Sequence, residues 1–424
     1  MAKSNGAPSP AETRISRRRL KIVLLLAFVV IVIYVAIPPS GIEYNLGYGI
    51  TIRNHRDSAV DAAPAANTSG VKNILLFTTF FESKDWWLGD RMGSAMFKSV
   101  CPVSNCYITN NREYLNSLSD FDAILFHYRD MVLNPLNPGL PNQRLRKPGQ
   151  RYIMFFVESP ENYKYDYDRF SNFFNWTMTY RMDSDIQAPY GRVIPKSSGF
   201  SYMPKNNEAG TWDHVYDPAN FAATLVTKPK KFHKLAQRPK AVAWIVSHCD
   251  TESDREGYVR ELKNHIGVDI FGACGSGHCE NCPTTVLKNY MFYLSFENSF
   301  CDQYVTEKLW RWLKKDIVPI VMGQQNYSDI VPPHSVINAI DFPEPKELAS
   351  YLKQLMNNDT EYLSYFWWKD FYEVSEDRSP SYCRLCQMLN DKNQPPQVRD
   401  HLNDWWSSKA NCKSKGSFTW SKYR

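Results

Sequence analysis

The sequence predicts an α/β protein built from two consecutive Rossmann-like domains. From Val71 to about Tyr202, short apolar runs rich in aromatic and β-branched residues alternate with polar segments, and the same alternation returns from Ala241 to Phe342. Between Asn289 and Gly323 a strand, a polar turn, a helix and a second strand follow one another, which is the order of a βαβ unit with parallel strands. With 424 residues, 43% of them hydrophobic, the chain is long enough for two domains.

The first forty residues predict a membrane anchor. A basic run at Arg17–Arg19 precedes an uncharged apolar run, Ile22–Ile37, whose length is near the lower end of the roughly 17–25 residues needed to span a bilayer. The basic side is expected in the cytoplasm and the rest of the chain in the lumen. A cleaved signal peptide is the alternative, but Pro38-Pro39 stands where small cleavage-site residues are expected. We therefore expect a cytoplasmic tail at residues 1–19, an anchor at 20–37 and a stem at 38–70.

Two further features indicate an oxidising lumen. The ten cysteines are an even number and all follow the apolar run, which favours disulfides. Four N-glycosylation sequons also follow it, at Asn67, Asn175, Asn326 and Asn358. The net charge of +6 is spread along the chain without a basic-aromatic motif, so we expect no nucleic-acid partner.

The first domain is predicted at residues 71–205. Its strands are expected at Ile74–Phe81, Ala123–His127, Tyr152–Val157 and Trp176–Tyr180. Less regular, helix-like patterns lie at Asp90–Lys98 and Arg112–Leu118. Residues 206–239 have weak periodicity and are expected to form the crossover to the second domain.

The second domain is predicted at residues 240–375. Its strands are expected at Ala241–Ser247, Val268–Phe271, Met291–Phe296, Ile317–Met322 and Val336–Phe342. Its helices are expected at Ser253–His265, Tyr304–Lys315 and Lys346–Asn357, where apolar residues recur at helical spacing. Residues 376–424 contain aromatic residues and cysteines but have no clear period.

Polar and ionisable residues gather where the strand Met291–Phe296 runs into the turn Glu297–Asp302 and the helix that follows. Ligands of open α/β sheets bind at the carboxyl ends of the strands, and the N-terminus of a helix attracts phosphate. The sequence therefore predicts a phosphate-binding site at this turn.

The segment FYLSFENSFCDQYVTEKLWRWLKKDIVPIVMG resembles the signature of the α1,3-fucosyltransferases, glycosyltransferase family 10. In that family FENS-x-x-x-x-Y-[VI]-T-E-K-L precedes an apolar VPVV-G strand. The resemblance extends across much of Asn73–Gly323, through FFVESPEN, MTYRMDSDIQAPYG and AWIVSHC. It implies a GT-B fold, in which two Rossmann-like domains face a cleft, and an inverting reaction with GDP-fucose as donor.

The resemblance also implies which residues hold the donor. Tyr304, Glu307 and Lys308 match positions at the GDP-fucose site, where Lys308 pairs with the diphosphate and Glu307 accepts from sugar or ribose hydroxyls. From the residues alone, Glu307 and Lys308 fit an ordinary solvated helix start equally well. Glu297 and Asn298 are further candidates for donor contacts, with a turn-shaping role as the alternative for Asn298.

Arg255 follows the AWIVS strand, as does the family arginine that approaches the diphosphate. A guanidinium holds two phosphate oxygens in one plane and stays charged at any working pH. The alternative, from the residues alone, is a surface arginine on an exposed helix, where Asp254 and Glu256 flank it.

Inverting fucosyl transfer needs one base, which takes the proton of the attacking hydroxyl. Glu158 ends an apolar strand, is followed by Ser159-Pro160, and matches the proposed family base in FFVESPEN. A strand-end glutamate in solvent is the bland alternative. Glu161 is a rival base, but it lies past the strand on a turn.

The tripeptide Asp183-Ser184-Asp185 suits Mg²⁺ or Mn²⁺ in other nucleotide-sugar transferases. By the resemblance it lies in the acceptor-side domain, so we expect it to be structural or to line the cleft. No metal is expected to be obligatory, with Mn²⁺ or Mg²⁺ as stimulators at most.

The cysteines permit two chemistries. Cys274, Cys279 and Cys282, with His278, have zinc-like spacing, although an oxidising lumen favours disulfides. The C-terminal pair of the family resembles Cys383 and Cys386, and the resemblance implies that they join Cys101 and Cys106. A redox role for this Cys-x-x-Cys lacks a thioredoxin-like context.

Together these features predict a single-pass type II protein of the Golgi membrane that transfers L-fucose from GDP-fucose to the 3-hydroxyl of a GlcNAc in glycoprotein N-glycans. The Cys-Arg-Leu-Cys tail resembles that of plant and invertebrate core enzymes, which favours the Asn-linked core GlcNAc. Lewis-type fucosylation of antennary GlcNAc is one alternative. An inactive lectin-like or adaptor protein with the same fold is the other.

Overall fold

The computed structural model describes residues 70–133, 139–196, 212–277 and 279–417. The expected cytoplasmic tail and anchor, the stem up to residue 69 and the sequon at Asn67 lie outside these residues. Within the described residues, no helix has the length and apolar character that crossing a bilayer requires.

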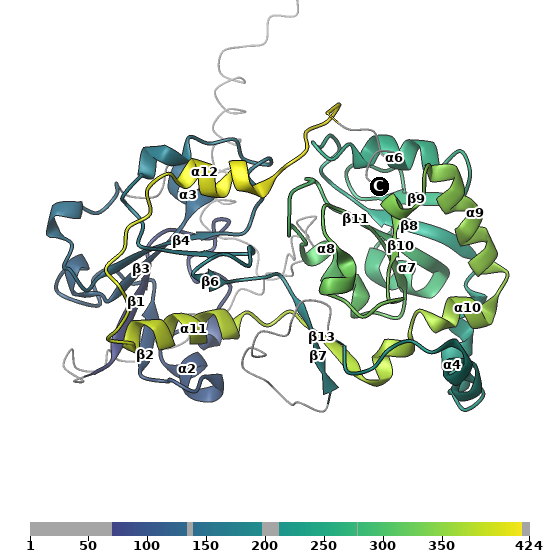
Figure 1. Cartoon of the computed structure of the whole chain (residues 1–424), viewed down its shortest axis with the longest axis horizontal. Helices are drawn as coiled ribbons and strands as arrows, with labels where there is room; N and C mark the ends of the chain where they lie inside the picture. The colour runs from purple at the N-terminus through teal and green to yellow at the C-terminus, as the bar shows by residue number, and fades with distance from the viewer. Residues whose placement is uncertain (1–69, 134–138, 197–211, 278, 418–424) are drawn as a thin grey trace, which may run out of the picture. The chain divides into compact units, whose positions relative to one another are not determined.

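The first half of the described chain forms a six-stranded parallel sheet with the order β2-β1-β3-β4-β5-β6 (Figure 1). Its strands are β1 (Lys72–Leu76), β2 (Cys106–Thr109), β3 (Ala123–His127), β4 (Arg151–Phe156), β5 (Trp176–Thr179) and β6 (Ile186–Gln187). The associated helices are α2 (Ala95–Val100) and α3 (Tyr128–Leu133). The sequence analysis missed β2, whose Cys-Tyr-Ile-Thr lies between Asn105 and Asn110 and offers no extended apolar run.

The helix expected at Arg112–Leu118 is wrong, since this segment forms turns and Leu118 only begins a short 3-10 helix. The Asn111 side chain accepts a hydrogen bond from the Glu113 amide, and the Ser117 hydroxyl accepts one from the Ser119 amide. Such local side-chain bonds compete with the hydrogen bonds of a helix.

The second half forms a five-stranded parallel sheet with the order β12-β11-β10-β8-β9. Its strands are β8 (Lys240–Ile245), β9 (Val268–Phe271), β10 (Tyr290–Phe296), β11 (Val318–Met322) and β12 (Ile337–Asn338). Its helices are α4 (Pro218–Leu225), α5 (Lys230–His233), α6 (Arg255–Leu262), α7 (Cys282–Asn289), α8 (Glu307–Leu313), α9 (Pro345–Met356) and α10 (Asp359–Ser364). The predicted βαβ unit is confirmed, because β10 and β11 pair in parallel and every residue of β10 is buried.

The sequence predicted that helix α8 begins at Tyr304, but in the structure it begins at Glu307. Thr306 has an extended backbone, with φ of -104° and ψ of -173°, and its side chain caps the helix by accepting from the Lys308 amide. Tyr304 therefore belongs to the preceding turn, where its side chain is buried.

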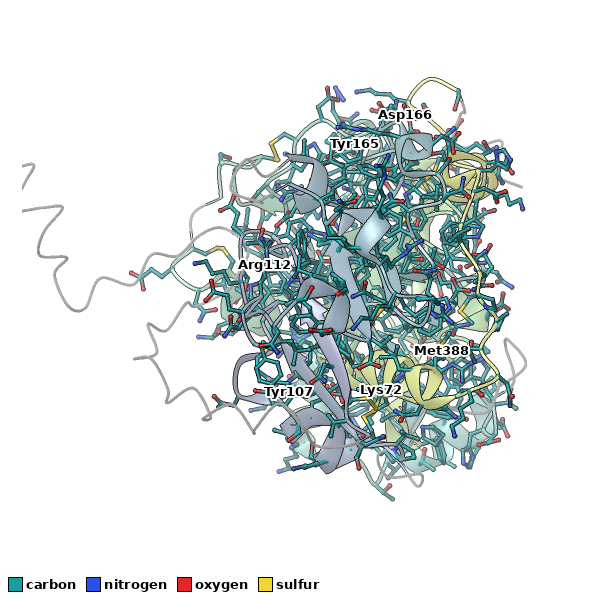
Figure 2. All side chains as sticks on the ribbon, turned by 90° about the vertical axis from the view of Figure 1, so that its left-hand side faces the viewer. Lys72, Tyr107, Arg112, Tyr165, Asp166 and Met388 are labelled. Atoms are coloured by element: carbon teal, nitrogen blue, oxygen red, sulfur yellow. A yellow bond between two sulfur atoms is a disulfide. The ribbon has the colours of Figure 1, made fainter. Side chains whose placement is uncertain are left out.

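The C-terminal segment returns to the first sheet. Strand β13 (Tyr372–Ser375) pairs antiparallel with β7 (Arg192–Pro195), and α11 (Ser379–Asn390) then packs against α2 and β1. Figure 2 labels Met388 of α11 and Lys72 of β1 in a view onto this half. Disulfides Cys101–Cys383 and Cys106–Cys386 join α11 to this half, in the pairing of segments that the family resemblance implies. The short helix α12 (Leu402–Trp406) follows.

Two of the sequon asparagines, Asn326 and Asn358, are exposed, whereas Asn175 is buried. The Asn175 amide donates to the Gln397 carbonyl at 2.8 Å, and its oxygen accepts from the Tyr152 amide at 2.8 Å. A glycan on this nitrogen is incompatible with the fold, so Asn175 is withdrawn as a glycosylation candidate.

Candidate active site

Glu158 lies two residues beyond the end of β4, at the carboxyl end of the first sheet. Its carboxylate accepts hydrogen bonds from the Asn162 amide at 2.9 Å and from the Tyr304 hydroxyl at 3.3 Å. Burial raises the pKa of Glu158 above its ordinary value, although the nearby charge of Lys308 acts in the opposite direction. A partly buried carboxylate with a raised pKa is a stronger base than one in solvent. The burial of Glu158 excludes the alternative that it is a solvent-exposed glutamate at a strand end.

Glu161, the rival base, is engaged elsewhere. Its carboxylate pairs with Lys164 at 2.9 Å and accepts a hydrogen bond from the Ser414 hydroxyl at 2.5 Å. Because these contacts occupy the Glu161 carboxylate, the geometry favours Glu158 as the base.

The turn Glu297–Asp302, which follows β10, is called the donor turn below. The buried Glu297 carboxylate accepts from both the amide and the hydroxyl of Thr306, each at 2.8 Å. Burial raises the pKa of Glu297. Because both carboxylate oxygens are used within the protein, Glu297 closes the donor turn onto the start of α8, and we assign it a positioning role.

Lys308 and Glu307 lie in the first turn of α8. The Lys308 ammonium donates to the Thr306 hydroxyl at 2.9 Å and lies 3.4 Å from the carboxylates of both Glu297 and Glu307. Burial acts to lower the pKa of Lys308, but the two carboxylates outweigh it and leave the pKa raised, so the ammonium keeps its charge. The Lys308 side chain is 26% exposed and that of Glu307 is 40% exposed, which leaves both accessible to a ligand.

Asn298 has an unused acceptor in the donor turn. The residue is 8% exposed, and its side-chain oxygen has no hydrogen-bond partner among the described residues. Asn298 lines a cleft of about 250 Å³. The other lining residues are Glu161, Asn162, His248, Asp250, Thr251, Glu252, Ser299 and Lys415. A buried carbonyl oxygen without a partner is costly, so a ligand N–H or O–H group in the cleft would satisfy it.

Arg255 is the first residue of α6 and is buried, so the alternative of a surface arginine is wrong. Its guanidinium donates to the carbonyls of Phe296 and His248, both at 2.9 Å, and to the Glu256 carboxylate at 2.9 Å. In this arrangement Arg255 ties the end of β10 to the loop after β8. The N–H groups of the Arg255 guanidinium are thus bonded to acceptors within the protein. A contact with phosphate would require some of these N–H groups to change partner.

The Asp-x-Asp tripeptide is integrated into the first half. Asp183 pairs with Arg181 at 2.8 Å and accepts from the Trp405 indole, while Asp185 accepts from the Thr177 amide and hydroxyl. Asp185 also pairs with Arg399. Within the described residues, no group of three potential metal ligands converges.

The zinc alternative for the second-half cysteines is wrong. Cys249 is bonded to Cys274, and Cys279 to Cys282, so these sulfur atoms are not thiolates. Cys301–Cys412 is a fifth disulfide.

The sequence analysis missed an aromatic loop after β1, at the same edge of the sheet as Glu158. Phe81, Glu82, Trp86 and Trp87 all have positive φ, a strained state that clusters at functional sites. Trp87 is 49% exposed and its ring stacks on Phe81, with an interplanar angle of 6°. The Arg129 guanidinium lies 4.9 Å from the centroid of the Phe81 ring. The aromatic run FFESKDWW was the available signal.

Family models and curated proteins match this chain over most of its length. The family model described as "Glycosyltransferase family 10 (fucosyltransferase) C-term" matches residues 235–405, and "Fucosyltransferase, N-terminal" matches residues 69–191. The chain is 35% identical to "Alpha-(1,3)-fucosyltransferase C" of Drosophila melanogaster, over 81% of this chain and 80% of that protein. It is also 35% identical to "4-galactosyl-N-acetylglucosaminide 3-alpha-L-fucosyltransferase FUT5" of Gorilla gorilla gorilla, over 70% of this chain and 71% of that protein. A crystal structure of an α1,3-fucosyltransferase with GDP-fucose has a TM-score of 0.46 and 15% identity, over 78% of this chain and 93% of that one.

Proposed function

The chain belongs to glycosyltransferase family 10, the fucosyltransferases, and from this premise we propose that it transfers L-fucose from GDP-fucose in α1,3 linkage to a GlcNAc of glycoprotein N-glycans. The observation that carries the proposal is the meeting of Glu158, from the first half, with Tyr304 beside the donor turn of the second half. A base on one half thus lies next to the phosphate-attracting start of a helix on the other, as a GT-B layout requires.

The proposed reaction is a single displacement with inversion. Glu158 takes the proton of the acceptor 3-hydroxyl while its oxygen attacks the anomeric carbon, and the bond to GDP breaks on the opposite face. Charge builds up on the leaving diphosphate, and the protonated Lys308 stabilises it with the first turn of α8. The unpartnered side-chain oxygen of Asn298 accepts a hydrogen bond from GDP-fucose. These groups supply the charge stabilisation without an obligatory metal.

On the acceptor side, we propose that a sugar ring packs on the exposed face of Trp87. Strain in the loop and the stack on Phe81 hold the indole in place before the acceptor arrives, and a fixed ring loses little entropy on binding. The acceptor GlcNAc then lies between this platform and Glu158.

For the acceptor we propose the Asn-linked core GlcNAc. The Cys-Arg-Leu-Cys sequence at residues 383–386 resembles that of plant and invertebrate core enzymes, which supports this choice. Antennary GlcNAc is the second candidate, since the gorilla relative is named for a 4-galactosyl-N-acetylglucosaminide acceptor.

We further propose that residues 20–37 anchor the protein in the Golgi membrane with the catalytic region in the lumen. The five disulfides are compatible with that oxidising compartment.

The test is an assay of the full-length protein with GDP-fucose and two acceptors, a core N-glycopeptide and a LacNAc-terminated glycan. Released GDP and the mass of the product are measured for each. Fucosylation of the core glycopeptide is the expected result. Product with only the LacNAc acceptor would transfer the assignment to antennary GlcNAc, and product with neither would favour the lectin-like or adaptor alternative.

A further inference from the structure

The C-terminal strap, Ala410–Lys415, leaves α12 and runs along the donor turn. The preceding helix α12 packs on the first half, where the Trp405 carbonyl accepts from Arg181 at 2.8 Å and Trp406 lies against Phe156 and Tyr180. The strap therefore begins on the half that carries Glu158 and continues to the half that carries the donor turn.

The donor turn and the strap are joined along their length. The disulfide Cys301–Cys412 links them covalently. On either side of it, the Lys413 amide donates to the Phe300 carbonyl at 2.8 Å, and the Asp302 amide donates to the Ala410 carbonyl at 2.9 Å. These contacts form a short antiparallel bridge centred on the disulfide.

A side chain from the second sheet reinforces the junction. Gln324, two residues beyond β11, donates its amide to the Asp302 carboxylate at 2.5 Å and to the Asn411 carbonyl at 2.9 Å. One residue thus holds both the turn and the strap.

The end of the strap reaches both walls of the cleft. The Ser414 hydroxyl donates to Glu161, which is three residues beyond Glu158. The next residue, Lys415, pairs with Asp250 at 2.8 Å, and its amide donates to Glu252 at 3.2 Å. Glu161, Asp250, Glu252 and Lys415 all line the cleft beside Asn298.

We propose that the C-terminal strap positions the donor turn and thereby sets the affinity for GDP-fucose. The strap would then be a third part of the site, beside Glu158 and the donor turn. The turn carries the unpartnered acceptor of Asn298, and while Glu297 holds its beginning, the strap holds its end at Phe300–Asp302. An acceptor held in place before binding gives higher affinity than one that must be ordered by the ligand. This inference rests on the proposed function.

The decisive variant is Cys301→Ser/Cys412→Ser, which cuts the covalent link while leaving no free thiol at either position. Its matched control, Cys279→Ser/Cys282→Ser, removes another disulfide, whose two cysteines are three residues apart. We expect the KM for GDP-fucose and the Kd for GDP to rise about tenfold in the first variant only, with kcat and the KM for acceptor within about twofold of wild type. An unchanged KM for GDP-fucose, or an equal rise for donor and acceptor, would overturn the proposal.

If the first variant does not fold, Gln324→Ala decides, because it weakens the same junction with all disulfides intact. We expect a rise of about threefold in the same two constants, and no rise would overturn the proposal. Wild-type protein is tested in parallel for fucosyl transfer and for GDP binding by calorimetry. Absence of both in the wild type would contradict the proposed function itself, whereas normal wild-type activity with unaltered variants contradicts only the role of the strap.

Discussion

The Tyr304 hydroxyl donates a hydrogen bond to the Glu158 carboxylate at 3.3 Å, across a sequence separation of 146 residues. Burial raises the pKa of Tyr304, so the phenol keeps its proton and acts as donor. One residue further along the chain, the Ser159 hydroxyl donates to that of Ser299 in the donor turn at 2.7 Å. These two bonds fix the distance between the proposed base and the donor turn.

Glu158→Gln is expected to lower kcat by roughly 10²–10⁴-fold, because the amide cannot accept a proton. The KM for GDP-fucose should change little, since the donor turn is intact. Steady-state kinetics with both substrates varied provide the measurement. Glu161→Gln is the control and should keep most of the turnover. A Glu158→Gln enzyme with near-normal turnover would refute the base assignment.

The raised pKa of Glu158 has opposite consequences for activity and for stability. The base must be ionised, so kcat/KM should fall on acidification at a higher pH than for an ordinary carboxylate. For stability, a raised folded-state pKa favours the protonated form, and that contribution is lost as the pH rises through the folded-state pKa. Glu158→Gln should therefore melt no lower than wild type near neutral pH, with any advantage vanishing in acid. A melting temperature clearly below that of wild type at neutral pH would contradict this.

Tyr304→Phe removes a hydrogen bond that lowers the pKa of Glu158. The acid limb of the kcat/KM profile should therefore move to higher pH. Tyr128→Phe is the matched control, because the Tyr128 hydroxyl is buried and has no partner among the described residues. The pH profiles of the two variants are compared, and an unshifted limb in Tyr304→Phe would show that the bond is absent in solution.

Trp87→Ala should raise the KM for the glycan acceptor by roughly fivefold, which corresponds to about 1 kcal/mol of lost ring contact. The KM for GDP-fucose should stay unchanged. Leu145→Ala, at a residue that is 67% exposed, serves as the control for a generic loss of surface apolar area. Equal effects of Trp87→Ala on both substrates would argue against an acceptor platform.

The roles of Asp183 and Asp185 can be separated by stability. Asp185→Ala leaves the Thr177 amide and Arg399 without their acceptor and should cost about 3 kcal/mol of unfolding free energy. Asp183 is 47% exposed, so Asp183→Ala should cost less and retain activity. Denaturant unfolding and activity with and without EDTA provide the measurements. If both variants lost activity and added Mn²⁺ restored it, Asp183 and Asp185 would be reassigned as metal ligands.

Local pattern was sufficient for much of the fold. Strand β3 and β9 have the bounds expected from the sequence, and the βαβ unit around β10 was predicted with its parallel pairing. Long apolar strands and amphipathic helices encode burial within a few residues of chain, and this is what periodicity detects. The start of α8 was predicted three residues early, because the extended backbone of the Thr306 cap leaves no mark on the apolar period.

The sequence nominated residues for the candidate site, but it did not indicate what each side chain contacts. The sequence named Glu158, Lys308 and Asn298, and the family resemblance supplied the donor. It did not reveal that Arg255 donates to the Phe296 and His248 carbonyls, or that Glu297 clamps Thr306. Hydrogen-bond partners depend on which rotamers fit a packed interior, and one chain position does not specify that.

The sequence by itself determined the alternation of strands and helices, the chemistry at the carboxyl ends of two strands and the family of the chain. Only the tertiary structure decided that Asn175 is buried, that Tyr304 contacts Glu158 and that Cys412 ties the C-terminal strap to the donor turn. The reason is physical. Apolar spacing records whether a residue faces the core, whereas contacts between residues more than a hundred positions apart exist only once both sheets and the returning C-terminal segment have packed together.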